Sequence, residues 1–123
     1  MQKTSCIIDK PFSANQMYVP IARGKLIKSK KYNLWIEKNL PHIKENLSPA
    51  KMYPVVIEIL VMANNQWKIK NDPDNLMKPI VDLLVRAEII PDDTARYVEA
   101  VHVRYLMGHN EPLARISYEE TQP

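Results

Sequence analysis

The fold of this chain is decided by the stretch Asp72-Pro73-Asp74-Asn75-Leu76-Met77-Lys78-Pro79, which places carboxylates and a lysine at the start of an amphipathic pattern. Asp74, Lys78 and Asp82 are four residues apart, so a helix would stack them on one face. The apolar positions recur at helical spacing on the other face: Leu76, Ile80, Leu83, Leu84 and Ala87. The stretch therefore predicts a helix over about 74–88 with one buried side and one polar side.

The start of this helix is expected close to the acids. Pro79 is tolerated near a first helical turn, where its missing N–H costs little. The free N–H groups of a helix start favour negative charge. They would keep Asp72 and Asp74 ionised, or bind a phosphate.

Composition indicates a single domain over residues 1–123. The hydrophobic fraction of 46% and charged fraction of 25% are those of a globular protein. Cys6 is the only cysteine, which excludes an internal disulfide and a cysteine-type zinc site and suits a reducing compartment. The first residues do not form a signal peptide, and no apolar stretch is long enough to cross a membrane. We therefore expect a cytoplasmic protein without a membrane partner.

Charge is unevenly distributed along the chain. Residues 1–71 carry a net charge of +8 and residues 72–123 a net charge of −5, within a total of +3. A basic run provides five positive charges without an acid: Arg23, Lys25, Lys28, Lys30 and Lys31. This pattern is typical of a polyanion-binding surface beside an acidic centre. A solvated loop and an uneven surface without a partner remain open alternatives.

The remaining periodicity predicts an α+β domain, with helices packed on a mixed sheet. The expected elements are strands at 4–9, 53–62, 96–107 and 113–118, a weakly signalled hairpin within 17–27, and helices at 30–46 and 74–88. Ser29 is the expected N-cap of the first helix, and Pro41 should kink or split it. Trp67, within the polar loop 63–71, either caps the core or stacks on a base.

Asp72, Asp74 and Asp93 are the candidate ligands of a metal ion. Carboxylates about 4 Å apart repel by roughly 4 kcal/mol per pair at an effective dielectric near 20, so a fold gathers them only around a cation. Mg²⁺ takes oxygen ligands and needs one or two carboxylates plus water and phosphate. Lys78 would meet a phosphate or a leaving oxygen. These residues form a consistent constellation for phosphodiester hydrolysis.

Other interpretations of the acids are weaker or excluded. The simplest is that Asp72 or Asp74 only caps a helix. A calcium loop counted from Asp72 lacks its glycine and glutamate, the three histidines lack zinc-protease spacing, and no glycine-rich phosphate loop exists. An Asp-x-Asp pair also occurs in sugar-nucleotide transferases, for which 123 residues is short.

The acidic stretch through Leu84, with Asp92-Asp93 downstream, resembles the signature of the RusA-type Holliday-junction resolvases, which are common in phages and prophages. The segment Pro11-Phe12-Ser13-Ala14-Asn15 resembles the proline-serine-asparagine segment of that family, and Tyr18 and the basic run also fit. The resemblance covers most of the chain.

The resemblance implies a small homodimer of mixed α/β fold that binds four-way DNA junctions in recombination and repair. It implies paired symmetric nicks made with Mg²⁺, or Mn²⁺ as a substitute. The metal carboxylates of the family fall on Asp72, Asp74 and Asp93, and its catalytic lysine falls on Lys78. Asn75, Asp82 and Asp92 match supporting positions: Asn75 to orient a carboxylate, Asp82 to pair with Lys78, and Asp92 to shape the turn. The expected DNA contacts are Asn15, Arg23, Lys25, Lys28, Lys30, Lys31, Lys68 and Lys70.

The sequence departs from the family pattern at two places, which concern the acidic stretch and the contacts with DNA phosphates. Pro73 separates the two acids, where other members can carry leucine. Lys68 and Lys70 stand where others can be richer in arginine, which grips phosphate with two hydrogen bonds. The leading alternative is a non-catalytic nucleic-acid-binding module of the same fold, and a more distant one is an enzyme acting on nucleotides or sugar-nucleotides.

Overall fold

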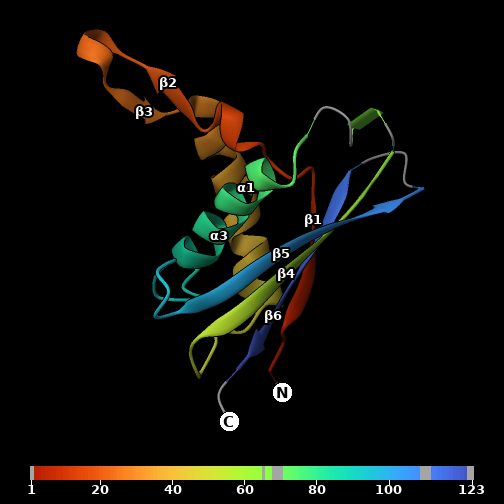
Figure 1. The fold of residues 1–123 in the computed structure, drawn as a ribbon. Helices are drawn as coiled ribbons and strands as arrows, with labels where there is room; N and C mark the ends of the chain where they lie inside the picture. The colour runs from red at the N-terminus through yellow and green to blue at the C-terminus, as the bar shows by residue number, and fades with distance from the viewer. Residues whose placement is uncertain (1, 65, 68–70, 109–111, 122–123) are drawn as a thin grey trace.

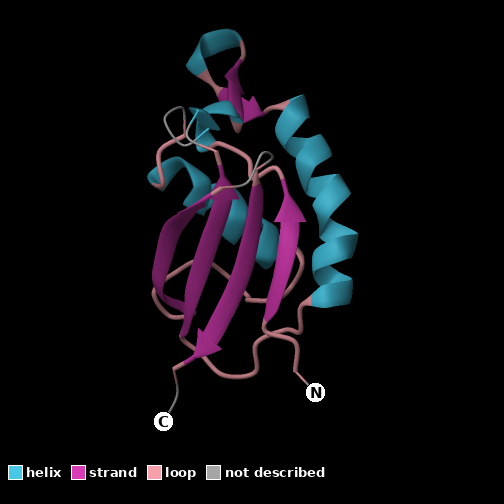
Figure 2. Cartoon of the chain, turned by 90° about the vertical axis from the view of Figure 1, so that its right-hand side faces the viewer, coloured by secondary structure: helices cyan, strands magenta, loops and turns pink. Residues whose placement is uncertain are grey.

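Two helices cover one face of a four-stranded mixed sheet (Figures 1 and 2) in the computed structural model, which describes residues 2–64, 66–67, 71–108 and 112–121. The strand order is β1-β6-β4-β5. The bounds are β1 Ser5–Asp9, β4 Val55–Ala63, β5 Val98–Met107 and β6 Leu113–Glu120. β4 runs parallel to β5, and the other two pairings are antiparallel. The prediction of a small single-domain α+β protein with a mixed sheet and two main helices is confirmed.

The buried face of the sheet follows from alternation along its central strands. In β4, the buried side chains are Val55, Ile57, Ile59, Val61 and Ala63. Their β-branched side chains suit a pleated surface packed on one side, and the alternate positions point to the other face. Since both helices lie on this side (Figure 1), the core forms between the helices and the sheet.

The first helix, α1 (Lys30–Asn46), begins where the sequence predicts. Ser29 caps it, because its hydroxyl oxygen accepts the backbone N–H of Tyr32 at 3.1 Å. Of the kink or split predicted at Pro41, the split is wrong, because α1 is one helix of 17 residues that contains Pro41.

The second helix, α3 (Asp74–Arg86), is closed by a left-handed turn. Glu88 has φ of 62°, its N–H donates to Val85 O, and the N–H of Ile89 donates to Leu84 O. This pair of hydrogen bonds is the Schellman motif. Pro79 lies in the second turn, beyond the predicted position, and its ring is buried.

A two-stranded hairpin projects from the end of the domain beyond α1 (Figure 1), as the sequence predicts. We call residues 17–29 the arm; it contains β2 (Tyr18–Pro20) and β3 (Leu26–Lys28). Its base is fixed because Met17 is buried and because the N–H of Ser29 donates to Met17 O at 2.7 Å. Within the part of the chain that the structure describes, no helix is long and apolar enough to span a bilayer.

Candidate metal and nucleic-acid site

Asp72 and Asp74 stand at the N-terminus of α3 with exposed side chains. The N-cap position is occupied by Pro73, and among the described residues no side chain makes a capping hydrogen bond there. The first turn is closed by backbone groups instead, with the N–H of Asn75 donating to Asp72 O at 3.1 Å. The interpretation of these acids as helix caps is therefore not supported, and both carboxylates are available to a ligand.

Lys78 lies one turn along α3 from this acid pair and is exposed. Its ammonium nitrogen is 5.7 Å from the centre of the Tyr18 ring, which belongs to the arm. This cation–π contact connects the base of the arm to the polar face of α3. The sequence did not assign Tyr18 to the site, because Lys78, which it contacts on α3, is 60 positions away in the chain.

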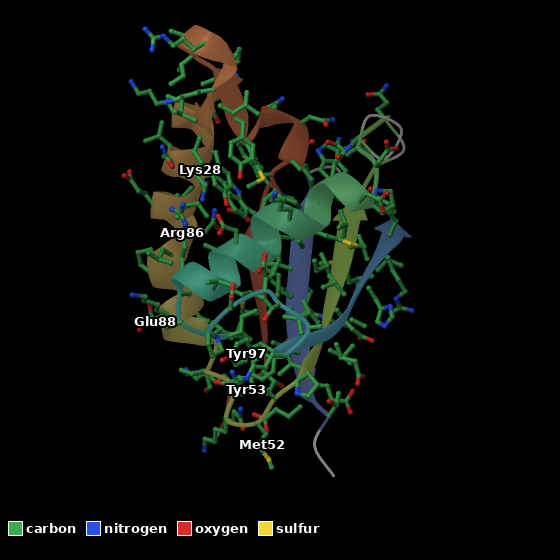
Figure 3. All side chains as sticks on the ribbon, turned by 60° about the vertical axis from the view of Figure 1, so that its left-hand side comes forward. Lys28, Met52, Tyr53, Arg86, Glu88 and Tyr97 are labelled. Atoms are coloured by element: carbon green, nitrogen blue, oxygen red, sulfur yellow. The ribbon has the colours of Figure 1, made fainter. Side chains whose placement is uncertain are left out.

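Asp82 has other partners than the predicted Lys78. It accepts a hydrogen bond from the Tyr32 hydroxyl, and its Oδ2 lies 3.3 Å from Lys28 Nζ and 3.5 Å from Arg86 Nε. Arg86 belongs to the last turn of α3 and Lys28 to the arm, and both are labelled in Figure 3. Burial, and secondarily the Asp82 carboxylate, raise the pKa of Tyr32 above its usual range. Asp82 therefore connects the arm and α1 to its own helix, α3. Lys28, one of the predicted DNA contacts, forms an ion pair with Asp82 in this arrangement.

Asp93 lies at the opposite end of the domain from the acid pair. It follows the C-terminus of α3, and 13 helical residues span about 20 Å. The turn that contains it leads to the start of β5, and just before the strand Thr94 O accepts the N–H groups of Tyr97 and Val98, each at 2.9 Å. Within this turn, Asp92 Oδ1 accepts the Asp93 N–H at 2.8 Å.

Asp72, by contrast, lies near the far end of β5. The hydroxyl of Tyr105 donates to the carbonyl oxygen of the adjacent Asn71. After burial, the Asp72 charge is the second cause that raises the pKa of Tyr105. Val98 and Tyr105 are seven positions apart in an extended strand, which corresponds to about 23 Å. The part of β5 from Val98 to Tyr105 is thus about as long as α3.

The structure therefore brings together Asp72, Asp74 and Lys78 but does not bring Asp93 to them within one chain. Across the described ranges, no group of three or more His, Cys, Asp or Glu side chains is close enough to hold a metal ion. The pair by itself suits Mg²⁺, which accepts one or two carboxylates and fills its remaining positions with water and phosphate oxygens. Asn75 is partly buried beside this pair.

The arm and the start of α1 carry the basic residues. Arg23 and Lys25 lie at the tip of the arm and Lys30 and Lys31 in the first turn of α1, all exposed. The arm also exposes apolar side chains that the charge pattern did not reveal: Val19, Ile21, Leu26 and Ile27. An unpartnered two-stranded hairpin with this composition is typical of a binding element.

Three further predicted contacts have different outcomes. Asn15 is exposed in the short helix Ala14–Gln16, next to the base of the arm. Lys68 and Lys70 lie outside the described residues. Trp67 packs edge-on against Tyr105, with ring centres 6.4 Å apart, which supports its role as a cap on the core.

No protein-family model matches the chain, and no curated protein matches its sequence.

Proposed function

We propose that this protein is a divalent-metal-dependent DNA endonuclease that resolves four-way junctions by paired nicks in recombination and repair. One observation carries the proposal: an exposed, uncapped carboxylate pair lies beside Lys78 at the base of a projecting basic arm. The acidic stretch with its downstream Asp92-Asp93 supports the choice of substrate through its resemblance to the RusA-type resolvases.

The residues have separate tasks in this proposal. Asp72 and Asp74 hold Mg²⁺ or Mn²⁺ through carboxylate oxygens, and the ion supplies Lewis-acid activation when bound. Lys78 contacts the phosphate to be cut, where its charge counters the negative charge that develops. Arg23 and Lys25 hold neighbouring phosphates from the arm.

Paired cuts need two such sites in one assembly. A homodimer with a two-fold axis matches the symmetry of a four-way junction and presents one site to each of two strands. Since the length of α3, about 20 Å, separates the acid pair from the turn that contains Asp93, we expect Asp93 to take part only if a second chain supplies it.

The test is cleavage of a labelled four-way junction with Mg²⁺ or Mn²⁺, with EDTA as the negative control. Asp74→Asn should retain junction binding and lose cleavage by about 100-fold or more, because several kcal/mol of transition-state stabilisation depend on the metal. Glu37→Gln is the matched control, since Glu37 is an exposed acid on α1. Equal cleavage by Asp74→Asn and Glu37→Gln would reject the assignment of the site.

The second candidate is a junction-binding module without catalysis. It is favoured by the position of Asp93, because the described residues of one chain include no group of three or more His, Cys, Asp or Glu side chains that could hold a metal ion. The same assay separates the two functions: a junction that is bound but stays intact with either metal identifies the binding module.

A further inference from the structure

The face of the sheet that points away from both helices carries polar side chains beside a hollow. These side chains point outward because their neighbours in the strands, Ile59, Val103 and Ile116, pack against the core. Figure 2 looks onto this outer face. The hollow has a volume of about 350 Å³ and lies across β4, β5 and β6. Its polar lining consists of Glu58, His102, Arg104, Arg115 and Ser117.

The sheet register brings two arginines to this hollow from different strands. Leu60 of β4 is the register partner of Arg104 in β5 and of Arg115 in β6, so the three residues form one row across the sheet. Neighbouring strands are about 4.8 Å apart, which places the two arginines about 10 Å from each other on either side of Leu60. Each arginine side chain is long enough to reach a group held above Leu60.

The charges of these two arginines are not neutralised within the described part of the chain. Among the described residues, neither Arg104 nor Arg115 forms an ion pair or a side-chain hydrogen bond, and both are exposed. A guanidinium group donates two parallel hydrogen bonds to a phosphate, and it loses little hydration in doing so. The arginine row therefore suits an anion that offers several oxygen atoms.

Glu58 is the opposing charge in the hollow. It lies two residues along β4 from Leu60, in the next row, with His102 and Ser117 as its register partners. Two residues of a strand span about 7 Å, so the carboxylate weakens the binding of an anion in the arginine row without preventing it. Two arginines and one glutamate leave the hollow with an excess of one positive charge when His102 is neutral.

We propose that this hollow binds a phosphate group, which the guanidinium groups of Arg104 and Arg115 hold above Leu60. The inference goes beyond the proposed nuclease and does not rest on it, because the hollow lies on the face of the sheet opposite to α3 and its described lining includes none of the residues assigned to cleavage. The phosphate belongs either to a nucleic-acid strand or to a free mononucleotide, which present the same oxygen atoms.

NMR spectra of the arginine side chains test the site directly. The chain has five arginines, so the Nε–Hε groups give few signals, and single replacements assign them. Titration with inorganic phosphate at constant ionic strength should shift the signals of Arg104 and Arg115 to saturation. Arg96 is the internal control, because it is exposed and lies over the Tyr97 ring, 5.6 Å from its centre, outside the hollow. Equal shifts without saturation at all three arginines would overturn the proposal.

Variants matched in charge separate a site from general attraction. Arg104→Gln or Arg115→Gln should raise the Kd for inorganic phosphate about tenfold, whereas Arg96→Gln removes the same charge and should change it by less than about twofold. Glu58→Gln should lower the Kd about threefold, because it removes a like charge about 7 Å away. Equal losses in Arg104→Gln and Arg96→Gln, or no gain in Glu58→Gln, would place the phosphate elsewhere and reject the site.

Two larger probes identify the source of the phosphate. Binding of deoxyadenosine monophosphate and of a short DNA duplex is measured without divalent metal, so that cleavage does not enter. A loss in Arg104→Gln for the duplex alone assigns the site to a nucleic-acid strand, and a loss for the mononucleotide assigns it to a free nucleotide. No loss for either probe rejects the proposal. Since cleavage is measured separately on a four-way junction, failure of the nuclease and failure of this site give different results.

Discussion

The hydroxyl group of Tyr32 on α1 donates a hydrogen bond to the carboxylate of Asp82 on α3. Tyr32 has no exposed surface, so this polar contact lies at the edge of the core. Lys28 from the arm reaches the same oxygen of Asp82 at 3.3 Å. One carboxylate thus fixes the arm and both helices relative to one another.

Tyr32→Phe should lower the free energy of unfolding by about 1.5–3 kcal/mol, because it removes a hydrogen bond to a charged acceptor. Urea denaturation measures this loss. Tyr97→Phe is the control, since the Tyr97 ring packs on Tyr53 and its hydroxyl makes no hydrogen bond among the described residues. A double-mutant cycle with Asp82→Asn should show coupling of about 1 kcal/mol, and additive losses would contradict a direct contact.

The cations of the arm should control the salt dependence of DNA binding. Replacing Arg23 or Lys25 by alanine should each reduce the magnitude of the slope of log K against log salt by about 1. Binding of the variant makes one phosphate contact fewer and therefore releases fewer counterions from the DNA. Titration of a labelled junction at several salt concentrations measures the slope. Lys44→Ala is the control, an exposed lysine in the last turn of α1. Equal slopes for all three variants would exclude the arm from the interface.

Glu88→Gly should stabilise the protein by about 1 kcal/mol. Glu88 holds a φ of 62° after the end of α3, a conformation that strains residues with a Cβ atom. Its side chain is exposed, so little contact is lost. The same change at Glu37, inside α1, should destabilise by about 1 kcal/mol. Thermal denaturation of both variants measures the two effects, and a loss of stability in Glu88→Gly would show that its side chain makes a stabilising contact.

Cys6 should make stability fall at alkaline pH. Burial raises the pKa of its thiol from 9.0 to about 11, so between these values the unfolded chain releases a proton that the native protein keeps. The free energy of unfolding should then decrease with rising pH, by at most about 1.4 kcal/mol per pH unit. The contribution is fully present below pH 9 and lost toward pH 11.

Comparison with Cys6→Ala isolates this contribution, because other groups titrate equally in both proteins. The difference in unfolding free energy between the two proteins should shrink from pH 8 to pH 10.5. Parallel curves would show that the thiol does not titrate differently in the folded state.

Local sequence patterns determined most of the secondary structure. The apolar spacing from Leu76 to Ala87 produced α3, Ser29 capped α1, and the alternation in β4 produced the buried face of the sheet. These features depend on neighbours within a few positions, so the sequence specifies them directly. The exposed acid pair and Lys78 were also found this way, because helical periodicity places them together.

The tertiary structure alone decided which distant groups meet. Asp82 binds Tyr32 and Lys28 across 50 and 54 positions, and Tyr18 lies over Lys78 across 60. Asp93 is held away from Asp72 because α3 and most of β5 lie between them, a separation that motif spacing does not encode. Periodicity fixes the direction of a side chain on its own element, whereas packing fixes the distance between elements.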